Sequence, residues 1–361
     1  MEKKKTMLDY IEMTPNKVLE NAKNPKELTK TLTDEYITNK YNEVYVVASG
    51  SSFNASVCAQ PFMEDVLGVR VNVISPSNFT NYYKHNKSDF IFVISQSGYS
   101  TNAIEALKRA KQLGVKAIGI TGDVDSDFKN YTDLLIDYKV GIETVGYVTV
   151  GVVTLVQFLM TFALNASLQL NKISKEKYDE AISSIVESAK LHQEIQEKSH
   201  AFIKKHYKSL SSMQKAYFCS SGAGMGIAFE AALKVGETVK IPAFPFDAEE
   251  YIHGPNLQLN PGYTVFIIDS NDKDSDRLKQ IYRATRAVSD NTYFIGSNVD
   301  ENSIYTDTNL SPLFTPLYYL PFFQIISHQI TEDLHRWEQH PLLKEFKKIA
   351  ASKSKNYVDN D

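Results

Sequence analysis

A serine-rich turn stands between a predicted strand and a predicted helix in the first half of the chain. Residues 95–100 read SQSGYS, directly after the apolar run 89–94 and directly before a helical pattern that starts at Thr101. The first N–H groups of a helix lack internal partners, and together with nearby hydroxyl groups they can bind an anion. Because this turn contains no Lys or Arg, we expect a small phosphoester there rather than nucleic acid. An ordinary serine N-cap is the alternative.

A second turn of the same kind follows the first predicted strand. Residues 49–54 read SGSSFN and again offer small donors before a helix. In an open parallel sheet, ligands bind outside the carboxyl ends of the strands, where the chain connections diverge. Both serine turns are therefore expected to face the same crevice.

A carboxylate and an imidazole in the second half form a candidate pair for proton transfer. Glu230, Lys234 and Glu237 are spaced for one helix face, and His253 precedes a Gly-Pro turn. Such a pair can move a proton between neighbouring carbon atoms. A surface glutamate and a capping histidine are the alternative interpretation.

Strands and helices alternate along the chain and would position these residues. Short apolar strands are predicted at 43–48, 69–75, 89–95, 116–121, 133–138, 215–220, 263–269 and 291–296, and helices at 54–67, 100–113, 227–240, 274–289 and 317–334. Apolar strands separated by helices indicate a parallel sheet that is covered on both faces. The strands of the two halves repeat at a nearly constant offset, which indicates one duplicated α/β domain. In the second copy the turn 269–272 reads DSND and would repel phosphate, so one phosphate site per chain is expected.

Composition narrows the class of protein. The chain has 361 residues, 43% of them hydrophobic and 23% charged, as in a globular protein with two domains. A net charge of −4 without a basic run argues against nucleic acid as a partner. Cys58 and Cys219 resemble buried free thiols, which suits the cytoplasm. The uncharged segment 145–170 is predicted as a buried helix rather than a membrane span, because polar residues interrupt it throughout.

Two weaker patterns are given their ordinary structural interpretation. His328, Glu332 and His335 could line up as metal ligands, but the same spacing occurs on any solvated or intersubunit helix face. The glycines at 222–226 lack the spacing of a dinucleotide turn and predict a tight turn. No metal and no cofactor is expected.

These motifs together resemble the sugar isomerase (SIS) domain family, and in two-copy form the isomerase half of glucosamine-6-phosphate synthase. The resemblance covers nearly the whole chain. It implies two tandem SIS domains, each with a parallel sheet flanked by helices on both faces. The corresponding boundaries are 25–172 for the first SIS domain, 173–205 for a helical connector, 206–345 for the second SIS domain and 346–361 for a C-terminal tail.

The resemblance also assigns roles to individual residues. The family motif SQSGET corresponds to the turn 95–100, CGTSYNS to the turn that starts at Ser49, EGALKLKE to 230–237, KHGP to His253 and GVAST to 146–150. It implies Glu237 and His253 as catalytic residues, together with Lys355 through a short C-terminal match. The implied phosphate and substrate ligands are Ser52, Ser95, Gln96, Ser97, Ser100, Thr149 and Lys234.

The reaction is inferred from the departures from the synthase. No glutaminase domain precedes the first sugar domain, so we do not expect amination from glutamine. The string 248–256, AEEYIHGPN, resembles stand-alone fructosamine-6-phosphate deglycases more closely. These relatives imply an enzyme that releases glucose 6-phosphate and an amine from a phosphorylated Amadori compound. An aldose–ketose phosphosugar isomerase and a non-catalytic sugar-phosphate-binding protein are the alternatives. The family also implies a homodimer or higher homo-oligomer, with the histidine supplied by a neighbouring subunit.

Overall fold

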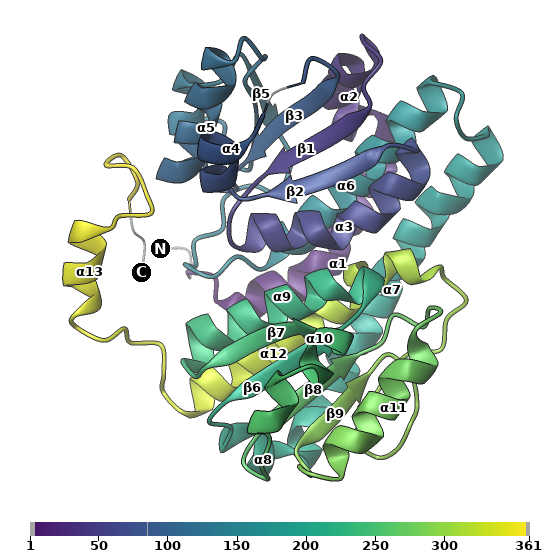
Figure 1. Ribbon diagram of the computed structural model, residues 1–361, viewed down its shortest axis with the longest axis vertical. Coiled ribbons are helices and arrows are strands. Elements are labelled where there is room, and N and C mark those ends of the chain that lie inside the picture. The colour runs from purple at the N-terminus through teal and green to yellow at the C-terminus, as the bar shows by residue number, and fades with distance from the viewer. Residues whose placement is uncertain (1–3, 85, 359–361) are drawn as a thin grey trace. The chain divides into compact units, whose positions relative to one another are not determined.

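The computed structural model describes residues 4–84 and 86–358 and divides into two compact units (Figure 1). Met7–Pro15 and Val186–Glu338 form the second unit, and the remaining described residues form the first. The division falls inside the helix that was predicted as a connector. Residues from Gln339 onward belong to the first unit, so the C-terminal tail is grouped with the domain that carries the serine turns.

The first unit contains one parallel sheet of five strands. The strands are β1 (Glu43–Val47), β2 (Arg70–Ile74), β3 (Asp89–Ile94), β4 (Ile118–Thr121) and β5 (Leu134–Asp137), in the order β2-β1-β3-β4-β5. Every pairing in it is parallel. The predicted strands of the first half are confirmed.

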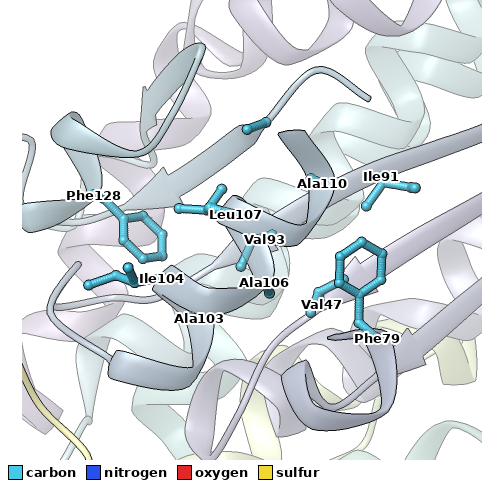
Figure 2. Close-up of a cluster of buried hydrophobic side chains, with 11 residues drawn as sticks. Val47, Phe79, Ile91, Val93, Ala103, Ile104, Ala106, Leu107, Ala110 and Phe128 are labelled. Atoms are coloured by element: carbon cyan, nitrogen blue, oxygen red, sulfur yellow. The ribbon is translucent and has the colours of Figure 1, made fainter. Parts of the chain in front are cut away.

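Helices cover both faces of this sheet, as the central strand β3 shows. Phe90 and Phe92 pack ring against ring with Phe162, at centroid distances of 6.2 Å. Ile91 and Val93 point to the other face and join the cluster shown in Figure 2. The helices on the first face are α2 (Pro25–Ile37), α3 (Ser51–Leu67) and α6 (Val150–Gln169), and those on the second are α4 (Pro76–Tyr82) and α5 (Thr101–Gln112). Because both faces are buried, the strands are apolar throughout rather than alternating.

Helix α6 is the one helix in the described chain that is long and apolar enough to cross a membrane, and it is buried from Val150 to Ser167. Its polar side chains bond to backbone carbonyl groups of the same unit. Gln157 Nε2 donates to Val18 O at 2.8 Å, and Ser167 Oγ donates to Val66 O at 2.7 Å. These bonds satisfy polar groups that would otherwise be costly to bury. The prediction of a buried core helix is confirmed.

The second unit repeats the sheet of the first. Its strands are β6 (Ala216–Ser220), β7 (Ala243–Asp247), β8 (Thr264–Ile268), β9 (Thr292–Ile295) and β10 (Ser303–Ile304), in the order β10-β9-β8-β6-β7. Counted along each half, both sheets have the order 2-1-3-4-5, which confirms the predicted duplication. The two strands that were not predicted, β7 and β10, lie at the edges. Pro245 is tolerated in β7 because an edge strand can lose one ladder hydrogen bond.

Two aromatic and aliphatic layers cover this second sheet. On one face Phe218 and Phe266 pack against Phe323, each at a centroid distance of 5.6 Å. On the other face Val265 and Ile267 lie in a cluster with helix α11 (Ser275–Arg286). Cys219 belongs to the same cluster, and burial raises the pKa of its thiol. Both cysteines are buried, as predicted. The helices in addition to those named are α1 (Met7–Lys23), α7 (Lys175–Lys205), α8 (Tyr207–Ser211), α9 (Met225–Lys234), α10 (Ala248–Ile252), α12 (Pro316–Asp333) and α13 (Leu343–Ile349).

Candidate functional site

The strand order brings the two serine turns together in the first unit. Strands β1 and β3 are neighbours, and the chain leaves them toward opposite edges of the sheet. This is the position where parallel sheets bind ligands. The turn 49–54 follows β1 and the turn 95–100 follows β3. Asn102 Nδ2, just after the second turn, donates to Ser49 Oγ in the first at 2.9 Å. The expectation that both turns face one crevice is consistent with this contact.

The turn 95–100 is held in one conformation by its own hydrogen bonds. Ser95 Oγ donates to Ser100 Oγ at 3.1 Å, and Gly98 N donates to Ser95 O at 3.0 Å. Gly98 has φ +68°, and a Cβ atom there would stand 1.8 Å from Ser126 Oγ. Only glycine therefore fits at this position. The hydroxyl groups of the turn are fixed before any ligand arrives.

Ser52 lies on the first turn of α3, where helix N–H groups are available. It is 9% exposed, and its carbonyl oxygen accepts a 2.7 Å hydrogen bond from Ser56 Oγ. Gly50 precedes the helix with φ +57°, a conformation that glycine adopts without strain. Ser52 thus lies at the carboxyl ends of the strands, where the resemblance predicts a ligand.

Glu143 is a residue of this region that the sequence did not single out. Its Oε1 accepts from Gln96 Nε2 at 2.6 Å and from Gly151 N at 2.7 Å. Its Oε2 accepts from Thr149 N at 2.8 Å. The carboxylate therefore joins two predicted ligands, Gln96 and Thr149, to the start of α6. Thr149 is fully buried, and its hydroxyl group donates to Tyr147 O at 2.8 Å. Glu143 lies in a loop between β5 and α6, where no periodic sequence pattern could have indicated it.

The C-terminal tail reaches the serine turn through Lys353. Lys353 Nζ lies 2.7 Å from Ser97 Oγ and 3.5 Å from Ser100 Oγ. The predicted tail residue, Lys355, is exposed and lies in the turn that is closed by the 3.1 Å hydrogen bond from Tyr357 N to Ser354 O. Among the described residues, the structure thus brings Lys353 to the turn, and a catalytic role for Lys355 stays a prediction.

A buried lysine links two carboxylates in the second unit. Lys234 Nζ lies 3.3 Å from Glu230 Oε1 and 2.9 Å from Glu237 Oε2. Lys234 and Glu230 are 1% exposed, whereas the Glu237 side chain is 36% exposed. Burial alone would lower the pKa of Lys234, but the two carboxylates raise it above its ordinary value. The predicted single helix face is confirmed, with Glu237 at its accessible end.

The helix that carries Glu237 changes its winding at that residue. Helix α9 ends at Lys234 and continues as a π-helix, η3 (Val235–Val239), instead of running unchanged to Lys240 as predicted. Lys240 then closes the helix with φ +60°. A π-helical turn displaces side chains from the regular register and is frequent at functional sites. Glu237 lies within this turn.

His253 stands on a turn, as its sequence context predicted. It is the C-cap of α10, its side chain is exposed, and Gly254 and Pro255 follow. Asp247 caps the other end of this helix by accepting from Glu249 N at 2.9 Å and from Glu250 N at 3.3 Å. The helix is therefore fixed at both ends, and the imidazole projects from its end. The partnership of His253 with Glu237 stays a prediction.

The second copy of the serine turn is occupied by its own carboxylate. Asp269 follows β8 as Ser95 follows β3, and it is fully buried. Its Oδ1 accepts from Asn271 N at 2.8 Å and from Ser275 Oγ at 2.7 Å, and its Oδ2 accepts from Ser297 Oγ at 3.2 Å. The donors that could hold a phosphate here already hold Asp269. This supports a single phosphate site per chain.

The two weaker sequence patterns have structural explanations. Trp337 Nε1 donates to Glu332 Oε2 at 2.5 Å, and the ring of His328 packs against Trp337 at 5.8 Å. Over residues 4–84 and 86–358 there is no group of three or more side chains that could hold a metal ion. The glycines after β6 form a short 3-10 turn, Gly222–Gly224, in which Gly222 has φ +53°.

Comparison with known proteins assigns the fold that holds these turns. The model of the SIS domain matches residues 37–164, which include both serine turns and most of α6. Residues 37–164 therefore form a SIS domain. Glutamine–fructose-6-phosphate aminotransferase from Aliivibrio fischeri is 26% identical over 310 residues, which are 81% of this chain and 49% of that protein. The enzyme of the same name from Clostridium tetani is 28% identical over 308 residues, with the same coverage.

Solved structures extend the likeness in fold to nearly the whole chain. A phosphosugar isomerase candidate from Clostridium difficile 630 has a TM-score of 0.88 at 23% identity and covers 98% of this chain and 100% of its own. The C-terminal domain of the aminotransferase from Francisella tularensis has a TM-score of 0.82 at 19% identity, covering 94% of this chain and 99% of that domain. The chain spans about half the length of the curated relatives it matches. The expected fold, with two parallel five-stranded sheets that are each flanked by helices, is confirmed and is consistent with two tandem SIS domains.

Proposed function

We propose that this SIS protein is an enzyme that acts on sugar phosphates by acid–base proton transfer. The observation that carries the proposal is the preformed turn 95–100 at the divergence point of the first sheet, with its hydroxyl groups fixed and its second copy filled by Asp269. Relatives named for fructose-6-phosphate chemistry and fold neighbours named phosphosugar isomerases support the same substrate class. The protein is proposed to work in the cytoplasm.

The proposed ligands of the phosphate are the residues around the two serine turns. Ser52, Ser95, Ser97 and Ser100 supply hydroxyl groups, and the start of α5 supplies backbone N–H groups. Gln96 and Thr149 are assigned to the sugar, with Glu143 holding both in place. Fixing one end of a substrate restricts the position of its reacting carbon atoms, and such positioning accounts for a large share of catalysis.

The proposed chemistry is a proton shift between C1 and C2 of a phosphorylated Amadori compound. Glu237 removes a proton from C1 to give an enaminol and returns it at C2, which leaves an imine at C1. Water hydrolyses the imine, so that glucose 6-phosphate and a free amine are released. His253 shuttles protons at the ring oxygen, and Lys234 orients the Glu237 carboxylate. Lys355 stays a candidate for a further proton donor.

An aldose–ketose isomerase is the second candidate, because it needs the same phosphate turn and the same base. The ketose/aldose isomerase for tagatose 6-phosphate from Escherichia coli shares the fold, with a TM-score of 0.71 at 14% identity. Its reaction differs from deglycation only after the proton shift, since no imine is formed. Sequence and fold therefore support both reactions.

One experiment separates the candidates. The protein is incubated with fructose 6-phosphate and with a panel of 6-phosphofructosyl amino acids, and glucose 6-phosphate is measured. Release from the amino-acid conjugates alone selects deglycation, and interconversion of the simple sugar phosphates selects isomerisation. Binding of these compounds without turnover would leave only a sugar-phosphate-binding role. Gel filtration at several protein concentrations tests the proposed homodimer.

A further inference from the structure

The C-terminal tail is attached to the helix start that flanks the serine turn. Ser352 O accepts a 3.1 Å hydrogen bond from Thr101 N, one of the first N–H groups of α5. Ser354 N donates to Tyr99 O at 2.8 Å, so the two segments form an antiparallel bridge between Ser100 and Lys353. These two backbone hydrogen bonds, one on each side of Lys353, fix the direction in which its side chain leaves the tail.

Aromatic and polar side chains fasten the same segment beyond the bridge. The rings of Tyr357 and Tyr99 pack at a centroid distance of 5.6 Å. Asn356 Nδ2 donates to Asp127 Oδ1 at 2.9 Å. Lys353 Nζ lies 5.2 Å from the Tyr357 ring, a cation–π distance. The Lys353 ammonium group therefore contacts the Tyr357 ring of the tail as well as Ser97 of the serine turn.

This placement puts a positive charge where the turn itself has none. Neither serine turn contains Lys or Arg, and the neighbouring loop carries Asp123, Asp125 and Asp127. Burial, and after it the negative charges of these aspartates, raise the pKa of Tyr99. A phosphate dianion would be repelled by that loop unless a cation stood beside it. Lys353, 2.7 Å from Ser97 Oγ and 3.5 Å from Ser100 Oγ, is that cation.

We infer that Lys353 is a phosphate-binding and specificity-determining residue, supplied by the C-terminal tail to the serine turn. Its ligand class is a phosphate monoester dianion. On binding, the ammonium group pairs with a phosphate oxygen while Ser97 and Ser100 turn their hydroxyl hydrogens toward the same group. This inference rests on the proposed function, since it requires a phosphorylated ligand in the turn.

The test measures the dissociation constant of glucose 6-phosphate by calorimetry on the full chain. A charge-assisted hydrogen bond contributes about 1.5–3 kcal/mol, so Lys353→Gln is expected to weaken binding about 10- to 100-fold. Lys353→Arg keeps the charge and is expected to recover most of the affinity. Lys344→Gln, an exposed lysine of α13, is the matched control and is expected to bind like the unmodified protein.

A structural role of Lys353 in seating the tail makes a different prediction. If Lys353 only seated the tail, Lys353→Gln would weaken the binding of phosphorylated and unphosphorylated ligands alike, and Lys353→Arg would not restore the affinity. We therefore expect that Lys353→Gln lowers the affinity for glucose 6-phosphate but not the affinity for the unphosphorylated sugar. In turnover assays we expect this variant to have a raised KM with little change in kcat, since the phosphate is remote from C1 and C2.

The failures of the two proposals are distinguishable. If Lys353→Gln binds glucose 6-phosphate as tightly as the unmodified protein while Ser97→Ala with Ser100→Ala abolishes binding, the inference about Lys353 is overturned and the phosphate turn stands. If the unmodified protein does not bind glucose 6-phosphate at all, the phosphate site of the proposed function is overturned, and the inference falls with it.

Discussion

The side-chain amide of Gln96 donates a 2.6 Å hydrogen bond to Glu143, a carboxylate that also accepts from Thr149 N and Gly151 N at the start of α6. A negative charge at a helix N-terminus is stabilised by the unpaired N–H groups and by the helix dipole. Glu143 therefore fixes the start of α6 and one residue of the serine turn with a single side chain. Its contacts make it a positioning residue for the proposed sugar site.

Replacing Glu143 by Gln is expected to weaken ligand binding through Gln96. The variant loses the charge that holds the Gln96 amide and the α6 terminus, so we expect a roughly 10-fold higher dissociation constant for glucose 6-phosphate and about 1–2 kcal/mol less stability. Calorimetry and urea unfolding measure the two effects. Glu105→Gln, which alters an exposed carboxylate on α5, is the control. Lower stability with unchanged affinity would mean that Glu143 is only a helix cap.

Replacing Glu237 by Gln is expected to abolish turnover while leaving the phosphate site intact. General base catalysis contributes about 10²- to 10⁴-fold, and an amide cannot accept the C1 proton. The Gln side chain keeps an oxygen that can accept from Lys234, so the helix is expected to stay folded. The measurements are kcat on the active substrate and the dissociation constant of glucose 6-phosphate. Glu187→Gln on α7 is the control, and unchanged turnover in Glu237→Gln would remove the base from the proposal.

The pH dependence of stability is expected to include a contribution from His192. This side chain is 1% exposed, its Nδ1 bonds to Leu317 O at 2.8 Å, and burial lowers the pKa to about 4 from 6.5. The unfolded chain takes up the proton first as the pH falls. The stability that the neutral ring provides is therefore complete above pH 6.5 and is lost between that pH and about 4, amounting to about 3 kcal/mol.

Unfolding of the unmodified protein and of His192→Gln at several pH values checks this contribution. Since Gln does not titrate, the variant is expected to lose about 3 kcal/mol less stability between pH 7 and pH 4. The remaining acid sensitivity, which comes from other groups, is common to both proteins. Parallel stability curves would show that the buried ring does not couple folding to protons.

The sequence predicted the sheets well because each buried strand is a short, continuous apolar run. Asp89–Ile94 is buried at every position, and such a pattern needs no information from the rest of the chain. The edge strand β7 was missed because Pro245 and a half-exposed face break that pattern. The π-helical turn at Glu237 was missed. Thr238 Oγ1 there bonds to Lys234 O at 2.9 Å within the helix and to Ser327 O of α12 at 3.4 Å, and the second contact joins segments that a local sequence pattern does not connect.

The candidate site was predictable where its residues are neighbours in sequence, and not where the fold joins distant segments. The serine turn is one uninterrupted string, whereas Glu143 and Lys353 reach it from a loop and from the C-terminal tail. Lys353 and Lys355 are indistinguishable by type and spacing. The turn after Ser354 decides which of them faces Ser97, and it depends on contacts with Tyr99 and Asp127 that the tail sequence does not contain.

Two glycines with the same backbone conformation allow a strict test of the preformed turn. Gly98 has φ +68° and Gly114 has φ +70°, so alanine is strained at both positions, at a cost of about 1 kcal/mol. A Cβ atom at Gly114 meets nothing within 4 Å, whereas at Gly98 it would stand 1.8 Å from Ser126 Oγ and 2.5 Å from Ser126 Cβ. Gly114→Ala thus measures the backbone strain alone.

Gly98→Ala is expected to add a steric clash to that strain and to displace the serine hydroxyl groups. We expect Gly98→Ala to be less stable than Gly114→Ala by about 1–3 kcal/mol, the usual cost of overpacking a well-packed site. Binding of glucose 6-phosphate should fall at least 10-fold in Gly98→Ala and stay unchanged in Gly114→Ala. If both variants bind glucose 6-phosphate with equal affinity, ligand binding does not depend on the geometry of the turn. Ser126→Gly removes the two closest contacting atoms and leaves Thr121 Oγ1 at 3.0 Å, so it is expected to relieve most of the clash. Recovery of binding in Gly98→Ala with Ser126→Gly would show that the ligand requires the position of the hydroxyl groups rather than glycine itself.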